Sequence, residues 1–191
     1  MRPEPEITVR RLTPETLDAF LEFMAERAFG DSPEWAGCYC WFPYWDPERG
    51  DFDARAPQDN REAMAQAVRE GRASGYLAFA HDSVVGWVNA APRVRFPQLA
   101  KLPGDGARTG ATPCFTIDPA WRRRGIARRL LAAAIDGLRE DGMARMEAGP
   151  YSQPKDDAHR YRGTVELYES AGYEKVAELS GGTTLMEKRL D

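Results

Sequence analysis

Apolar residues in the first third of the chain recur with two different periods. Residues 7–11 alternate apolar and polar side chains, which predicts a strand. A period of three to four residues then predicts a helix that begins near Thr13 and ends at Gly30, since a capping hydroxyl comes first and a glycine last. The apolar face of this helix comprises Leu17, Phe20, Leu21, Met24 and Phe29. After a proline-rich loop, a second helix is expected from Asn60 to about Glu70.

The middle of the chain has two apolar runs separated by a short polar turn. Residues 76–80 and 84–90 are rich in apolar side chains, and the turn at 81–83 joins them in a predicted β-hairpin. Residues 92–112 carry many proline, glycine and charged residues, which favours a long loop. A short apolar strand is then predicted over 113–117.

The last third alternates helical and extended patterns. Residues 125–140 have apolar positions three and four apart, which predicts a helix, and residues 143–148 form a strand candidate. A short helix over 163–171 and a last strand over 183–190 follow. With neither repeats nor linkers, this order predicts a single α/β (α+β) domain over residues 1–191.

Composition and charge narrow the classes of function. Hydrophobic residues make up 42% of the chain and charged residues 29%, as in ordinary globular proteins. The net charge of −4 argues against nucleic acid as a partner, because a phosphate backbone requires a basic surface. No apolar run suits a signal peptide or a membrane span, so we expect a cytoplasmic protein without a membrane partner. Cys38, Cys40 and Cys114 are then expected to be reduced thiols.

Five arginines occupy residues 122–129, where a predicted strand and turn lead into a helix. Arginines at a helix N-terminus oppose the helix dipole, at a cost of roughly 0.3–1 kcal/mol each. A phosphate ligand would offset that cost, because free backbone N–H groups and the dipole both favour an anion there. Gly125 lacks a Cβ and would allow a close approach. The alternative from the residues alone is a solvated basic helix start.

The spacing of this loop resembles a known signature. Arg122, Gly125 and Ala127 match Q/R-x-x-G-x-G/A, the pyrophosphate loop of the GNAT N-acyltransferase superfamily. Residues 167–174, LYESAGYE, resemble the segment that closes the fourth helix of that family and begins its sixth strand. The chain is also similar to an uncharacterised bacterial subgroup with a CxC segment after the first helix. The subgroup's features stand here as Cys38-Tyr39-Cys40-Trp41, Gly86-Trp87-Val88 leading to Ala91-Pro92-Arg93, and Tyr161-Arg162-Gly163-Thr164.

The resemblance implies a fold and an activity. The fold would be a mixed, mostly antiparallel sheet of about six to seven strands with helices on both faces. The activity would be N-acetyl transfer from acetyl-CoA to a primary amine of an unidentified small acceptor, by direct attack in a ternary complex. The expected partners are acetyl-CoA and this acceptor, and a homodimer is an assembly that the family allows. No metal is expected.

The resemblance also implies a coenzyme site on the strand and the arginine-rich turn. The diphosphate would lie on backbone N–H groups of the loop, and the pantetheine arm would lie beside the strand. One N–H of that strand would polarise the thioester carbonyl. The residues assigned to this site are Phe115, Thr116, Ile117, Arg122, Arg123, Arg124, Gly125, Ile126, Ala127 and Arg128.

Two residues are candidates for proton transfer. Tyr168 matches the family tyrosine that protonates the departing thiolate, and a phenol with a pKa near 10 can donate at neutral pH. The alternative is a core aromatic residue. Glu147 lies late in the strand candidate 143–148, where several family members keep a base, and its alternative is a solvent-facing carboxylate.

Residues 35–45 contain six of the twenty aromatic residues of the chain. In the family's fold this segment lies beside the acceptor groove, so its aromatic faces would suit a cationic amine. Trp35, Tyr39, Trp41 and Trp87 are the assigned acceptor-binding residues. The alternative is a small satellite core beneath the loop.

Two rival functions remain at this stage. The first is a non-catalytic acetyl-CoA-binding or sensing module that keeps the arginine-rich turn. The second is a small-anion or metal-binding protein that uses this turn or the cysteines. Zinc sites usually have four ligands with wider Cys spacing than the single residue between Cys38 and Cys40, which disfavours a metal.

Overall fold

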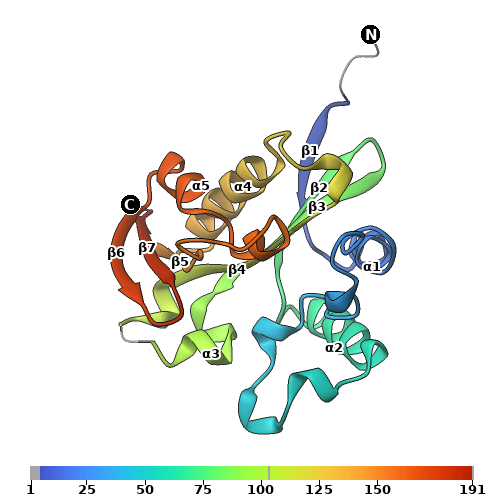
Figure 1. The fold of residues 1–191 in the computed structure, drawn as a ribbon, viewed down its shortest axis with the longest axis horizontal. Helices are drawn as coiled ribbons and strands as arrows, with labels where there is room; N and C mark the ends of the chain where they lie inside the picture. Colours follow the sequence, from blue (N-terminus) through green and yellow to red (C-terminus); the bar gives the residue numbers. More distant parts are fainter. Residues whose placement is uncertain (1–4, 103, 191) are drawn as a thin grey trace.

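A computed structural model describes residues 5–102 and 104–190. Its centre is a seven-stranded sheet with the order β1-β2-β3-β4-β5-β7-β6 (Figure 1). All neighbouring strands are antiparallel except β4 and β5. The strands are β1 (Ile7–Arg11), β2 (Gly75–Ala80), β3 (Ser83–Pro92), β4 (Thr109–Ile117), β5 (Arg145–Ala148), β6 (Glu174–Leu179) and β7 (Thr183–Arg189). The predicted mixed, mostly antiparallel sheet is therefore confirmed.

Helices cover both faces of the sheet. The helices are α1 (Leu17–Glu26), α2 (Pro57–Arg69), α3 (Pro97–Ala100), α4 (Ile126–Glu140) and α5 (Val165–Ser170). In Figure 1, α1 and α2 lie on the opposite side of the sheet from α4. Alternate residues of β2 serve the two cores, since Tyr76 packs in the α4 core and Leu77 in the α1–α2 core. None of the helices in the described ranges has the length and apolar character needed to cross a bilayer.

The structure corrects three predicted helix boundaries. The first helix begins at Leu17 rather than near Thr13, because the Thr13 N–H donates to the Thr16 hydroxyl at 2.9 Å and closes a turn. This helix ends at Glu26, four residues before Gly30. The second helix begins at Pro57, a residue whose fixed φ suits a first helical position. Asn60 therefore lies inside α2, buried, with its side-chain amide donating to the Gly37 carbonyl at 3.1 Å.

The predicted loop over residues 92–112 is wrong in two places. It contains α3 and the first residues of β4, which begins at Thr109 instead of residue 113. This part of β4 has small side chains rather than an apolar run. Packing explains why a small residue stands here, because a Cβ at Gly110 would lie 2.8 Å from Leu138 of α4. The first part of β4 therefore packs closely against α4, although its sequence has no apolar pattern that would predict a strand.

The sheet opens between β4 and β5. Their pairing runs only from Thr109–Arg145 to Ala111–Glu147, and β5 ends at Ala148. Residues 114–117 of β4 remain paired with β3 on the other side. Proline at position 113 has no N–H to give to a neighbouring strand. The open edge of β4 instead faces the short turn formed by Ala158–Arg162, which packs against it.

Candidate functional site

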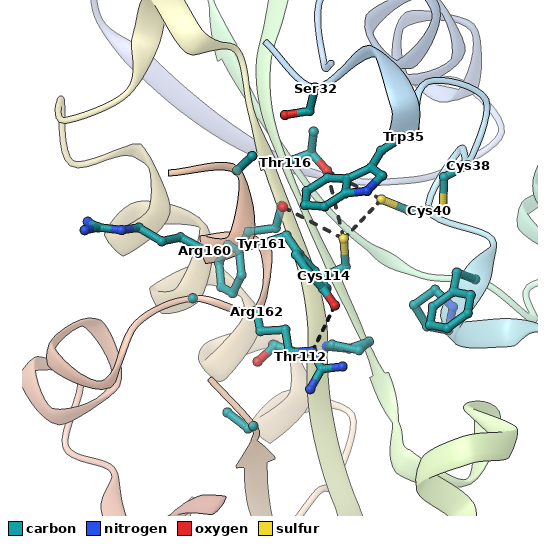
Figure 2. Close-up of a pocket in the computed structure, with 18 of the residues that line it drawn as sticks. Ser32, Trp35, Cys38, Cys40, Thr112, Cys114, Thr116, Arg160, Tyr161 and Arg162 are labelled. Atoms are coloured by element: carbon teal, nitrogen blue, oxygen red, sulfur yellow. Dashed lines mark hydrogen bonds between the residues drawn. The ribbon is translucent and has the colours of Figure 1, made fainter. Parts of the chain in front are cut away.

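A cavity of about 860 Å³ lies where β4 and β5 separate. Its walls come from distant parts of the chain: residues 34–38, 111–117, 147–149 and 160–164, together with Arg122, Arg123 and Ala127. The strand 115–117, the arginine loop (residues 122–127) and the start of the aromatic segment (residues 35–45) thus share one cavity. Figure 2 shows this convergence around β4, with Trp35 and Tyr161 approaching from opposite sides.

The backbone of the arginine loop presents free donors. Gly125 precedes α4 with a left-handed φ of 74°, and a Cβ there would meet no atom within 4 Å. The first bond into α4 runs from Arg129 N to the Gly125 carbonyl at 3.2 Å. Within the described chain, the amides of residues 123–128 donate to no backbone carbonyl. Free N–H groups at the N-terminus of a 15-residue helix provide the geometry that holds an anion.

The arginine side chains hold the loop between two other segments. Arg122 forms a two-point ion pair with Asp31, in which Nη2 donates to Oδ1 at 3.0 Å, and this guanidinium holds the pKa of Asp31 below its usual value. Arg123, 84% exposed, pairs with Asp157 at 3.2 Å. Arg124 lies over the Trp121 ring at 5.0 Å. Arg122 thus braces the loop, whereas the exposed Arg123 is available to an incoming anion.

The other residues assigned to the coenzyme lie in two environments. Phe115, Thr116, Ile117 and Ala127 line the cavity. Ile126 is 1% exposed and belongs to the α4 core, where it would contact a Cβ at Gly86 at 2.9 Å. Arg128 is exposed on the first turn of α4. Ile126 can therefore offer only its backbone N–H to a ligand.

Three thiols gather beside β4. The Sγ atoms of Cys40 and Cys114 are 3.4 Å apart, and Cys40 Sγ lies 3.5 Å from the Thr116 hydroxyl (Figure 2). All three cysteines are free thiols and line the cavity. Burial raises the pKa of Cys38 to about 12, and the contact with Cys114 and burial raise that of Cys40. Among the described residues, no group of three His, Cys, Asp or Glu side chains is arranged to hold a metal ion.

Tyr168 lies beneath the cavity wall rather than in it. Its side chain is fully buried and is absent from the cavity lining. The hydroxyl donates to the Arg162 carbonyl at 3.0 Å and lies 3.1 Å from the Thr112 hydroxyl. Burial raises the pKa of Tyr168 well above that of a free phenol. In this arrangement the phenol joins the Arg162 backbone to β4.

Glu147 does line the cavity, and it is tied to a buried cation. Its Oε2 accepts from Arg93 Nη1 at 2.8 Å, and its own side chain is only 11% exposed. Arg93, 1% exposed, also donates to the Leu102 and Gly104 carbonyls at 3.1 and 3.0 Å. The sequence was also compatible with a solvent-facing Glu147, but in the structure its side chain is nearly buried at the cavity wall.

The four aromatic residues assigned to the acceptor separate into two groups. Trp35 lines the cavity and meets the rings of His159 and Tyr161 edge-on at 5.2 and 5.5 Å. The other three do not line it. Trp87 is fully buried 4.9 Å from Phe20, Tyr39 lies in the same α1–α2 core, and Trp41 stacks on Tyr44. The structure thus places Tyr39 and Trp87 in the α1–α2 core and Trp41 against it, rather than in the acceptor wall or in a separate satellite core.

Three residues of the site were not assigned a role from the residue pattern. Arg93 belongs to the features of the subgroup but had no recognisable partner, because Glu147 lies 54 residues away in the sequence. Tyr161 and Arg162 were noted only as a feature of the subgroup, and their position in the cavity follows from the turn at 158–162. The signal available in the sequence was the aromatic–cationic pair directly before Gly163.

Solved structures of other proteins share this fold. An N-acetyltransferase from Staphylococcus aureus Mu50 is 16% identical, with 97% of this chain and 99% of that chain covered and a TM-score of 0.59. YncA from Salmonella typhimurium, solved with its cofactor acetyl-CoA, is 19% identical over 97% and 94% of the two chains, with a TM-score of 0.57. The PaiA N-acetyltransferase from Thermoplasma acidophilum, in complex with coenzyme A, is 15% identical over 96% and 99%, with a TM-score of 0.58.

A comparison with curated proteins gives no match. The model of the acetyltransferase (GNAT) family matches residues 35–173, well over half of the chain. The matched range includes the open edge of β4, the arginine loop and α5. With the fold and this match together, the chain belongs to the GNAT acetyltransferase family.

Proposed function

We propose that the protein is an acyl-CoA-dependent N-acetyltransferase that transfers an acetyl group from acetyl-CoA to a primary amine of a small acceptor. The observation that carries this proposal is the single cavity that joins the arginine loop, the open edge of β4 and the aromatic segment. Acetyl-CoA carries a charged diphosphate at one end and a thioester at the other, so it needs a continuous cavity that reaches both sites. The proposal includes a cytoplasmic location, one domain over residues 1–191, a homodimer and membership of the CxC subgroup.

In the proposed complex the chain holds acetyl-CoA mainly through its backbone. The diphosphate accepts hydrogen bonds from free amides within residues 123–128, and Arg123 adds a charge. The pantetheine arm lies along residues 115–117, whose edge is not paired with β5. A free N–H of β4 polarises the thioester carbonyl as negative charge develops on its oxygen.

The acceptor amine approaches from the side of Trp35 and Glu147. Its lone pair attacks the thioester carbonyl carbon within the ternary complex, which saves the entropy of a separate encounter. Glu147 lines the cavity, as do Glu34, Asp53 and Asp157, and Arg93 fixes its orientation. We assign Glu147 to receive or relay the proton that the amine loses. Trp35 offers an aromatic face to the acceptor.

A coenzyme titration tests the proposal. The wild-type protein is expected to bind acetyl-CoA with micromolar affinity in isothermal titration calorimetry. Gly125→Glu should abolish binding, because it places a carboxylate and a strained left-handed residue at the diphosphate. Gly142→Glu is the matched control, since Gly142 also has a positive φ and open space but follows the opposite end of α4. Binding to folded Gly125→Glu as tight as to the control would contradict the loop assignment.

One observation favours a second function, a non-catalytic acetyl-CoA-binding module. The tyrosine assigned as the acid, Tyr168, is buried away from the cavity. A thiol-release assay with acetyl-CoA and a panel of primary amines separates the two functions. Acetyl transfer to an amine above the rate of thioester hydrolysis supports the enzyme. Tight coenzyme binding with no transfer to any amine supports the module.

A further inference from the structure

We propose that Tyr161, rather than Tyr168, donates the proton to the departing coenzyme thiolate, and that Arg162 and Tyr151 position its hydroxyl. This inference rests on the proposed function. It starts from location, since Tyr161 and Arg162 line the cavity and Tyr168 does not. Tyr161 lines the same cavity as Cys114 of β4, the strand along which the pantetheine is proposed to run (Figure 2). The turn that carries Tyr161 packs against this strand.

The hydroxyl of Tyr161 has a fixed set of partners. Arg162 Nε donates to it at 3.2 Å, and the Tyr151 hydroxyl lies 3.2 Å away. The Arg162 guanidinium also lies 4.5 Å above the Tyr151 ring and 5.5 Å from the Tyr161 ring. Trp35 holds the Tyr161 ring edge-on from the other wall. Because one lone pair of the phenol oxygen already accepts from Arg162, its O–H remains free to donate to Tyr151 or to a sulfur in the cavity.

The electrostatics suit a proton donor. Burial raises the pKa of Tyr161 to about 12, and the nearby Arg162 opposes that rise. The phenol is therefore fully protonated at neutral pH, and the tyrosinate formed by donation lies against a permanent cation. Its titratable neighbours include Tyr151 at hydrogen-bond distance and, across Trp35, His159, and Cys114 on β4 lines the same cavity. The hydroxyl of Tyr168 has Thr112 and the Arg162 backbone carbonyl as its partners among the described residues, and no cationic side chain there.

In the proposed step the amine nitrogen bonds to the thioester carbon, the carbon–sulfur bond breaks, and its electron pair stays on sulfur. The Tyr161 proton moves to sulfur and gives free coenzyme A. The tyrosinate beside Arg162 regains a proton through Tyr151 from solvent, which receives the proton lost by the amine. The net reaction is acetyl-CoA plus amine to acetylamide plus coenzyme A.

A binding experiment tests the contact without needing the acceptor. Calorimetry at pH 7 to 9.5 compares coenzyme A with desulfo-coenzyme A, which lacks the thiol. As the pH rises and the thiol ionises, the affinity of wild type for coenzyme A, divided by its affinity for the desulfo analogue, should rise about tenfold. The reason is that a phenol donates a strong hydrogen bond to a thiolate. Tyr161→Phe should remove this rise and keep the affinity for the desulfo analogue. Arg162→Gln should reduce it, and provides a second variant if Tyr161→Phe does not fold.

Two comparison variants make the result decisive. Tyr173→Phe removes a buried hydroxyl that contacts Met146 and does not line the cavity, so it should keep the rise. An unchanged rise in Tyr161→Phe, or its loss in Tyr168→Phe alone, would overturn the assignment. Failure of wild type to bind either compound would instead remove the proposed function, and this inference with it. With an acceptor from the amine panel, Tyr161→Phe should lower kcat by about a hundredfold at an unchanged Kd for acetyl-CoA.

Discussion

At the residue scale, Arg93 is a buried cation in contact with one carboxylate and two backbone carbonyls. A buried charge is tolerated only when its partners replace its lost hydration. Glu147 and the carbonyls of residues 102 and 104 do so here, and they link β5 to the segment before β4. The same contacts hold the Glu147 carboxylate at the cavity wall. Stability and the placement of a candidate base thus depend on one side chain.

Removing Arg93 should therefore be costly. Arg93→Met is expected to lower the free energy of unfolding by about 3–5 kcal/mol, because it leaves the buried Glu147 with only the longer contact to Arg145 at 4.0 Å. Urea unfolding at neutral pH measures the change. The double variant Arg93→Met/Glu147→Met should recover part of the loss. Arg95→Met, which removes an exposed arginine two residues away, should cost under about 1 kcal/mol. Equal losses from Arg93→Met and Arg95→Met would contradict this account.

The cysteines allow a second test at this scale. Because the pKa values of Cys38 and Cys40 are raised, both thiols stay protonated at pH 8 and should react slowly with a thiol reagent in the native protein. Denaturation should release all three equivalents at once. Spectrophotometric titration gives the rates, and mass spectrometry gives the order of labelling. Rapid native labelling of Cys38 or Cys40 would show that their surroundings are not as described.

Individual side chains were the hardest feature to predict from the sequence. The spacing of Arg122, Gly125 and Ala127 identified a loop whose amides are free in the structure. Trp87 was assigned to the acceptor, yet it points into the α1–α2 core, since alternation along a strand buried on both faces does not say which face a residue takes. Tyr168 matched a motif, but a motif does not show whether a side chain is buried, because burial depends on tertiary packing.

At the scale of elements, α4 was predicted from its period, and the structure explains why it packs so closely. Apolar residues three and four apart, such as Leu130, Leu131 and Ala134, place one face of the helix on the sheet. Gly137 allows the last turns to approach β2, because a Cβ there would collide with the Tyr76 hydroxyl and lie 2.7 Å from its Cζ. The starts of α2 and β4 were missed because a proline and small residues, rather than a periodic pattern, determine them.

Gly137→Ala tests this close approach. Alanine is the better helix former by about 1 kcal/mol, so an unconstrained site would be stabilised. Here we expect a net loss of about 1–3 kcal/mol, because the new Cβ displaces α4 from Tyr76 and overpacks the interface. Thermal and urea unfolding measure it. Adding Tyr76→Phe should restore part of the stability, since it removes the nearest colliding atom, and a stabilised Gly137→Ala would show that the helix is not held there.

At the scale of the whole molecule, ion pairs tie the segments around the cavity together. Asp31 joins the loop before the aromatic segment to Arg122, and Asp157 joins the 158–162 turn to Arg123. The order of strands and helices was predictable, because periodicity and the order of motifs both act along the chain. The closure of the cavity could not be predicted, because it depends on ion pairs between residues 91 and 34 positions apart in the sequence.

These links predict an acid-sensitive fold. The pKa of Asp31 is lowered in the folded state, chiefly by hydrogen bonds from Arg122. Its contribution to stability is therefore complete above its unfolded pKa of 3.8 and is lost as the pH falls through the lower folded pKa. The urea midpoint should fall between pH 5 and about pH 3. Asp31→Asn should show a smaller fall, and an equal fall in both proteins would exclude Asp31 as a contributor.

The short junction between β4 and β5 has a mechanical consequence. Three register pairs hold the four-stranded and three-stranded parts of the sheet together, whereas five or more join β1 to β2 and β2 to β3. Ladder hydrogen bonds resist bending, so this seam is the most compliant line across the sheet. An acyl-CoA bound in the opening would contact both parts of the sheet and restrict their relative motion. Loading this donor would therefore stiffen the framework that, in the proposed reaction, holds the thioester carbonyl still during the attack of the acceptor.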